Sequence, residues 1–130
     1  MIVVDASAAV DLLLRLEGSR RIAAAISAES ALDAPELIET EFVSCLRRWN
    51  RSGKIDAGRA REALDDFAAL PLKLHRHSPL RSRVWDLRDH FSAYDATYVA
   101  LAQSLDSPLL TTDARLRRTA ASLIALVELE

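Results

Sequence analysis

The chain has 130 residues, of which 50% are hydrophobic and 28% charged, and its formal net charge at pH 7 is −2. This length suits one domain, residues 1–130, with a core of its own, and the few Gly and Pro residues argue against a disordered chain. The single cysteine, Cys45, excludes an intrachain disulfide. Because the chain has no basic leader and no apolar run of about 18 residues, we expect a soluble, cytoplasmic protein with no membrane partner.

The chain opens with a short apolar run, Ile2-Val3-Val4, that leads directly into Asp5. A continuous apolar run is typical of a strand buried on both faces of a parallel sheet. Ser7 is a suitable N-cap for the helix expected over 8–14. Asp5 should therefore lie at the carboxyl end of the first strand, where open parallel sheets place their functional sites.

Helical and strand patterns alternate along the rest of the chain. Helical spacing of apolar residues predicts helices over 19–28, 35–51, 56–70, 78–87, 93–105 and 113–120. Short apolar runs predict strands over 31–34, 72–75, 108–111 and 124–127. In these elements Ser19 is expected as a cap, Pro35 in a first helical turn, and Trp49 and Trp85 as the large side chains of an aliphatic core. The alternation predicts an α/β fold, a three-layer α/β/α sandwich with a central, mostly parallel sheet.

Three aspartates lie at junctions between predicted elements. Asp5 follows the first strand, Asp95 lies early in the helix from Ala93, and Asp113 follows the strand at 108–111. The helix over 35–51 adds Glu39 and Glu41, which lie about 80° to either side of its apolar stripe, so spacing alone does not choose between them. Taken singly, each acid has an ordinary explanation, such as a helix cap or a solvated charge.

Several carboxylates at one edge of a sheet repel one another unless a cation lies between them. Mg²⁺ and Mn²⁺ are the expected occupants, because these hard ions prefer oxygen ligands. Such an ion lowers the pKa of a bound water and stabilises charge that develops on a phosphate. The acids together therefore predict a site for Mg²⁺ or Mn²⁺ that needs no His or Lys base.

Other kinds of site fit the sequence less well. His75 and His77 form an H-x-H pair, but a zinc site would need a second pair of ligands. The sequence contains no P-loop, no G-x-G-x-x-G and no G-x-S-x-G. Cys45 lies on an apolar helical stripe, which predicts a core position.

Arginines gather in two stretches, 47–51 and 115–118. Runs of charge are usually solvated faces. If the acids do form a cleft, however, these arginines are where a phosphate backbone would rest, and Arg47, Arg48 and Arg115 are the expected contacts.

Four stretches of the sequence, spread over nearly its whole length, resemble the PIN-domain family, and within it the VapC-type toxin ribonucleases of bacterial toxin–antitoxin pairs. These stretches are Val3-Val4-Asp5-Ala6-Ser7, residues 34–42, Ala93-Tyr94-Asp95-Ala96 with residues 98–102, and residues 108–116. The Tyr-Asp-Ala and Thr-x-Asp pieces, in this order and spacing, are the most specific.

The resemblance implies roles for particular residues. Asp5, Glu41, Asp95 and Asp113 match the metal-binding acids of the family, which selects Glu41 over Glu39. Ser7 and Thr111 fall where the family often has a hydroxyl that lines the site. The family also implies Mg²⁺- or Mn²⁺-dependent cleavage of RNA by a metal-activated water, a homodimer, and inhibition by a VapB-type antitoxin that covers the cleft.

Three competing functions remain. The first is a catalytically silent PIN-like module that binds RNA or a protein, although all four acids are present. A phospho-acceptor signalling domain is a poorer match, because it needs a second acid near the first strand and a lysine after a late strand. A phosphatase with a D-x-D nucleophile pair is disfavoured, because residue 7 is Ser.

Overall fold

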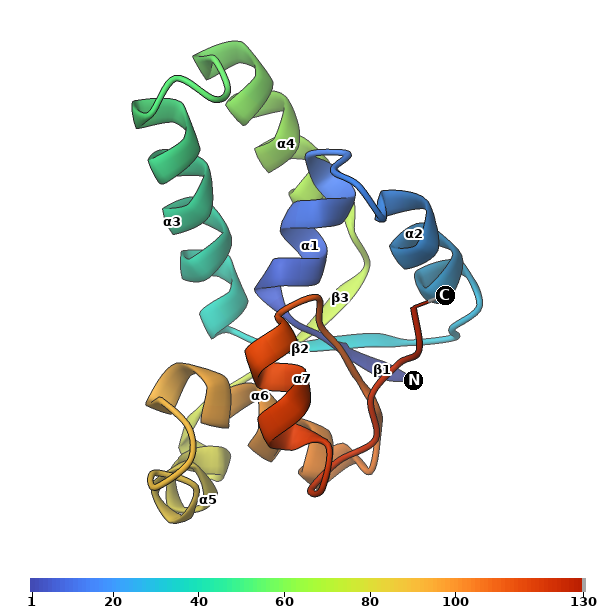
Figure 1. Ribbon diagram of the computed structural model, residues 1–130, viewed down its shortest axis with the longest axis vertical. Helices are drawn as coiled ribbons and strands as arrows, with labels where there is room; N and C mark the ends of the chain where they lie inside the picture. Colours follow the sequence, from blue (N-terminus) through green and yellow to red (C-terminus); the bar gives the residue numbers. More distant parts are fainter. Residues whose placement is uncertain (130) are drawn as a thin grey trace.

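A four-stranded, wholly parallel sheet forms the centre of the computed structural model, which describes residues 1–129 (Figure 1). Its order is β3-β2-β1-β4, with the bounds β1 (Ile2–Val4), β2 (Leu32–Pro35), β3 (Leu72–His75) and β4 (Leu109–Leu110). The strand at the start of the chain is thus a central one. This arrangement confirms the predicted parallel α/β fold.

Helices cover both faces of the sheet, which gives the three predicted layers. One face carries α1 (Ala6–Leu13), α2 (Ser19–Ser27), α3 (Leu37–Arg51) and α4 (Ala57–Ala69). The other carries a 3₁₀ turn (Ser78–Leu80), α5 (Arg81–Asp86), α6 (Ala93–Leu105) and α7 (Ala114–Ala120). Each face of the sheet has its own hydrophobic core: the first core lies under α1 to α4 and the second under α5 to α7. Within β1, the side chains of Ile2 and Val4 pack into the first core and that of Val3 into the second, and all three are fully buried. The opening strand is therefore buried on both faces, as predicted. Along residues 1–129, every helix is too short or too polar to span a bilayer.

The helix α6 lies deepest in the second core, with every residue from 97 to 102 buried. Its first turn is fixed by Ser92, whose side-chain hydroxyl accepts a hydrogen bond from the Asp95 N–H at 3.1 Å. Tyr98 is buried, but Tyr94, one helical turn earlier, is 62% exposed. Tyr94 belongs to the first turn, which projects beyond the core.

Two predicted helix caps are wrong by one or two residues. Asp5, not Ser7, occupies the N-cap position of α1, so Ser7 lies in the first turn of the helix. Gly18, not Ser19, precedes α2 and has a φ of +89°, a left-handed conformation that favours glycine. In both places the helix begins earlier than the capping side chain suggests.

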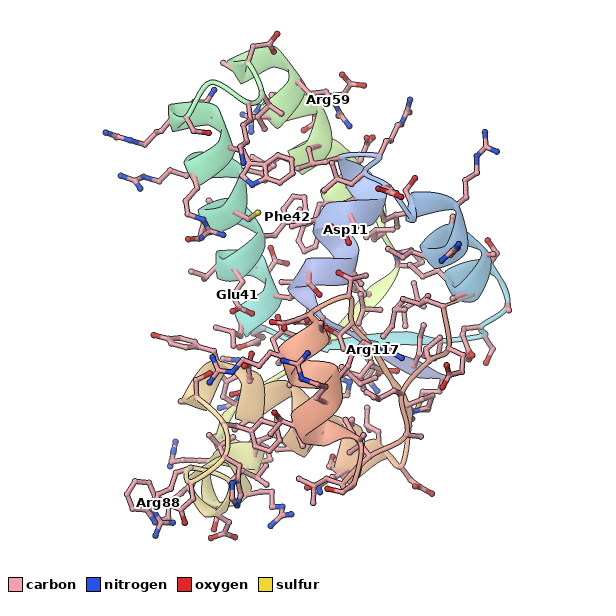
Figure 2. The ribbon with its side chains drawn as sticks, in the orientation of Figure 1. Asp11, Glu41, Phe42, Arg59, Arg88 and Arg117 are labelled. Atoms are coloured by element: carbon pink, nitrogen blue, oxygen red, sulfur yellow. The ribbon has the colours of Figure 1, made fainter. Side chains whose placement is uncertain are left out.

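Two predictions are wrong because local signals did not indicate how the strands pair. Pro35 ends β2 opposite His75 of β3 instead of starting a helix, so α3 begins at Leu37. The strand expected over 124–127 is reduced to one parallel bridge between Leu109 and Leu126. The Arg117 guanidinium holds this last segment by donating to the carbonyls of Thr111 and Val127 (Figure 2).

Both tryptophans were predicted in the core, but only Trp49 packs against it. Trp49 is partly buried against the first core, under the ammonium group of Lys54. Trp85 is 65% exposed, and the Arg88 guanidinium lies 4.3 Å from its ring centroid. The helix that carries Trp85, α5, has only six residues, none of them buried, and it begins after a 3₁₀ turn instead of at Ser78.

Candidate functional site

A cleft of about 390 Å³ opens at the carboxyl edge of the sheet, and all four predicted acids line it. Each comes from a different element: Asp5 ends β1, Glu41 lies in the second turn of α3, Asp95 in the first turn of α6, and Asp113 just before α7. Because β1 and β4 are adjacent and parallel, the residues that follow them meet at one edge. The alternative acid, Glu39, is exposed and is not among the residues that line the cleft.

Asp5 is the most deeply buried of the four acids, with 7% of its surface exposed. Its Oδ2 atom accepts hydrogen bonds from the Ser7 hydroxyl at 2.7 Å and from the Thr111 hydroxyl at 2.6 Å. The two hydroxyl oxygens are themselves 3.1 Å apart. Both predicted hydroxyl residues therefore lie at the acid cluster and fix the orientation of Asp5.

The loop after β4 is tied to this network through its backbone. The Thr112 N–H donates to the Ser7 hydroxyl and the Asp113 N–H to the Thr111 hydroxyl, each at 3.1 Å. One oxygen of Asp113, Oδ1, accepts from the N–H groups of Arg115 and Leu116 at 3.0 and 3.1 Å. Asp113 thus caps α7 and lines the cleft at once, with one oxygen already engaged.

Glu41 is hydrogen-bonded to a residue of the core on the other face of the sheet. The Tyr98 hydroxyl of α6 donates to its Oε1 atom at 2.6 Å. In Figure 2, Glu41 lies near the start of α3, and Asp11, which also lines the cleft, lies on the adjacent α1. No local sequence pattern predicts the hydrogen bond between Tyr98 and Glu41, since the two residues are 57 positions apart.

Burial and mutual repulsion both act on the acids. Burial raises the pKa of Asp5, and the charge of Asp113 raises it further, against the hydrogen bonds from Thr111 and Ser7. Burial likewise raises the pKa of Glu41 and of Asp95, and the neighbouring carboxylates add to both effects. The hydrogen bonds and the positive charge that the protein supplies therefore do not fully offset burial and repulsion at these acids.

Apart from the Cys45 thiol, the possible metal ligands among the side chains that line the cleft are carboxylate and hydroxyl oxygens, which suit a hard divalent cation. A cation would also offset the repulsion that raises the carboxyl pKa values. In the described part of the chain, however, no three His, Cys, Asp or Glu side chains form a ready ligand cluster.

The predicted arginines lie in different places. Arg48 lines the cleft, where its Nη1 atom lies 3.4 Å from the Ser44 hydroxyl. The charge of Arg115 acts on Asp95 and partly offsets the rise in its pKa that burial and the neighbouring carboxylates cause. Arg47 lines a separate, largely apolar groove between α3 and α4.

Among the cleft residues with a polar or thiol side chain, three were not predicted as part of a site: Asp11, Ser44 and Cys45. Ser44 and Cys45 follow Glu41 by three and four positions, and Asp11 follows Ser7 by four. That spacing along α3 and α1 is the signal that could have found them. Cys45, expected in the core, is half-buried: it packs against the core and also forms part of the cleft wall.

The H-x-H pair has structural partners instead of a metal. His75 Nε2 lies 2.7 Å from Oδ1 of Asp33, a buried aspartate of β2 that the sequence analysis did not single out. His77 Nε2 accepts the N–H of Leu37 at 3.0 Å and so caps α3. The two imidazoles therefore bind separate partners within the protein.

Comparison with known proteins identifies the family to which the sequence and the fold correspond. The family model described as PIN domain matches residues 2–122. The ribonuclease VapC1 of Mycobacterium tuberculosis is 44% identical over 115 residues, which are 88% of this chain and 86% of VapC1. Among solved structures, M. tuberculosis VapC20, described as a sarcin-ricin loop cleaving toxin, has a TM-score of 0.70 at 14% identity and covers 98% of this chain and 100% of its own. VapBC2 from Rickettsia felis, bound to a DNA fragment from its promoter, has a TM-score of 0.71 at 12% identity, with both chains fully covered. With a family model and a relative that each span most of its length, this chain belongs to the PIN-domain family.

Proposed function

We propose that this protein is an endoribonuclease that hydrolyses RNA phosphodiester bonds in the acid-lined cleft, and that it is the toxin of a toxin–antitoxin pair. The observation that carries the proposal is the meeting of four carboxylates from four separate elements in one cleft. The relative that is 44% identical is named a ribonuclease, and one structural neighbour is described as a sarcin-ricin loop cleaving toxin.

The proposed cofactor is Mg²⁺ or Mn²⁺. Asp5 and Asp95 are the acids proposed to bind it directly, and Glu41 and Asp113 would complete the set, in part through water. For Asp113 this indirect role suits an acid whose Oδ1 already caps α7. When bound, such an ion supplies a water of lowered pKa and stabilises negative charge on the phosphate.

The residues of the chain itself position the reaction. Ser7 and Thr111 hold the Asp5 carboxylate in one orientation by donating to its Oδ2 atom. Arg48 in the cleft wall and Arg115 beside Asp95 are proposed to bind RNA phosphates, since the acids alone would repel them. A contact from Arg47 would have to be made outside the cleft.

The first test is cleavage of a mixed tRNA and rRNA pool by purified, partner-free protein in Mg²⁺, Mn²⁺ or EDTA. We expect discrete cuts that disappear in EDTA and in Asp5→Asn. Glu41→Gln should slow cleavage by roughly 10–100-fold. The matched control is Glu39→Gln, which changes an exposed acid two residues away and should cut normally. Folded wild type that binds Mn²⁺ but cuts no RNA would favour the alternative, a catalytically silent RNA- or protein-binding module.

The proposed partners follow from the same function. A VapB-type antitoxin would cover the cleft, and a VapBC pair is named in the description of one structural neighbour. We also propose a homodimer and, because RNA is the substrate, action in the cytoplasm. Co-purification with the antitoxin should abolish cleavage, and its removal should restore cleavage. Sedimentation of the isolated toxin gives its oligomeric state.

A further inference from the structure

Tyr98 has the largest side chain among the fully buried residues of 1–129, and only 1% of its surface is exposed. Its ring packs in the core on the α6 side of the sheet, so the position of its hydroxyl is fixed by packing. That hydroxyl donates to Glu41 Oε1 at 2.6 Å. A rigid donor on α6 therefore reaches a flexible acid on α3.

A purely structural role would not require this oxygen. A phenylalanine fills almost the same space and has no hydroxyl that needs a partner inside the protein. Glu41 is half-buried and has three side-chain torsions, so without a fixed partner it could leave the cleft for solvent. The hydrogen bond with Tyr98 removes that freedom and engages Oε1 only.

We infer that Tyr98 is a positioning residue, whose hydroxyl holds Glu41 in the cleft with Oε2 directed to a bound divalent cation or to a water on it. The inference rests on the proposed function, because it needs a cation in the cleft. Tyr98 is not among the residues that line the cleft, so it acts through Glu41 instead of touching the ion or the RNA. Its part resembles that of Ser7 and Thr111 toward Asp5.

The test compares two variants that each lose one hydroxyl from the same helix. Tyr98→Phe removes the bond to Glu41 and keeps the ring. Thr97→Val is the matched control: Thr97 is 7% exposed, and its hydroxyl bonds only to the Ala93 carbonyl at 2.7 Å. Calorimetry measures Mn²⁺ binding without RNA, and thermal unfolding confirms that both variants fold.

We expect Tyr98→Phe to bind Mn²⁺ about tenfold more weakly than wild type, since partners that orient metal ligands contribute 10–100-fold to affinity. Thr97→Val should bind as wild type does. Cleavage by Tyr98→Phe should need more Mn²⁺ and should approach the wild-type rate once Mn²⁺ is saturating. This pattern separates positioning from a general loss of structure.

A double-mutant cycle shows whether the effect passes through Glu41. In a Glu41→Ala background, Tyr98→Phe should weaken Mn²⁺ binding no further. An equal loss in that background, or wild-type affinity in Tyr98→Phe alone, would overturn the positioning role and leave the proposed nuclease intact. Wild type that binds no Mn²⁺ would overturn the metal-dependent function and this inference with it.

Discussion

Asp95 lies beside Asp5 and Asp113 in the cleft, and no side chain of residues 1–129 donates a hydrogen bond to its carboxylate. Burial and the charges of its two neighbours raise its pKa, and Arg115 offsets only part of this effect. Such an acid destabilises the metal-free fold. Its presence is understandable if the site is selected for binding a cation instead of for stability.

Replacing this acid should separate stability from activity. We predict that Asp95→Asn melts a few degrees above wild type in the presence of a chelator, because it removes one of the mutually repelling charges. The same variant should no longer cleave RNA. Thermal unfolding and gel-based cleavage measure the two effects, with Glu39→Gln as the control that should change neither. A melting temperature below that of wild type would contradict the repulsion argument.

The raised pKa values of Asp5, Glu41 and Asp95 also set a pH dependence. Above the ordinary carboxyl range, near pH 4, the folded state still binds protons that the unfolded state has released. The contribution of these acids to the free energy of unfolding therefore falls as pH rises through that range and up to the raised pKa values.

We predict that the stability gained by Asp95→Asn over metal-free wild type is small near pH 4 and widens toward neutral pH. Denaturant unfolding at a series of pH values, with chelator present, measures this difference. A gap that stays constant with pH would show that the aspartate does not titrate differently in the folded protein.

At the scale of the element, the first turn of α6 connects helix capping to the site. Ser92 caps this turn through the N–H of Asp95, the same residue whose carboxylate lines the cleft. Asp56 caps α4 in the same way, through the N–H of Arg59, but does not line the cleft.

We predict that Ser92→Ala and Asp56→Ala each lower the free energy of unfolding by about 1 kcal/mol. Only Ser92→Ala should also reduce cleavage, because it loosens the turn that positions Asp95. Unfolding in denaturant and initial cleavage rates at saturating Mn²⁺ provide the comparison. Equal activity losses in the two variants would indicate that stability alone is responsible.

Elements with strong local signals were predictable from the sequence. The caps at Asp56 and Asp113 and the start of α6 at Ala93 follow from side-chain chemistry close by in the chain. The acids at the strand ends followed from parallel topology, whereas the choice of Glu41 over Glu39 needed the family resemblance.

Features that depend on distant parts of the chain were not predictable. Pro35 looks like a helix start, yet it pairs with β3, and the expected strand over 124–127 forms only one bridge. The bond between Tyr98 and Glu41 joins two helices from opposite faces of the sheet. Apolar spacing describes which face of an element is buried, but not which polar atoms meet across the fold.

At the scale of the whole molecule, repulsion among the acids of the cleft means that a bound cation should raise the free energy of unfolding. We predict that Mn²⁺ at 100 times its dissociation constant stabilises wild type by about 2.7 kcal/mol, and that EDTA reverses the effect. The stability of a variant with both Asp5→Asn and Asp95→Asn should change little when Mn²⁺ is added. Because salt screening alone also weakens repulsion, NaCl at matched ionic strength is the control. Equal stabilisation by NaCl would contradict specific binding.

The central strand β1 pairs with β4, so two strands that lie far apart in the sequence are neighbours in the sheet. Asp5 receives its hydrogen bond from Thr111, 106 positions later. During translation the acid cluster therefore cannot be completed until β4 and Asp113 have been synthesised. A nascent or prematurely terminated chain lacks Asp113 and the strand that orients Asp5. The order of the strands thus delays RNA cleavage until the segment from β4 to Asp113 has joined the sheet.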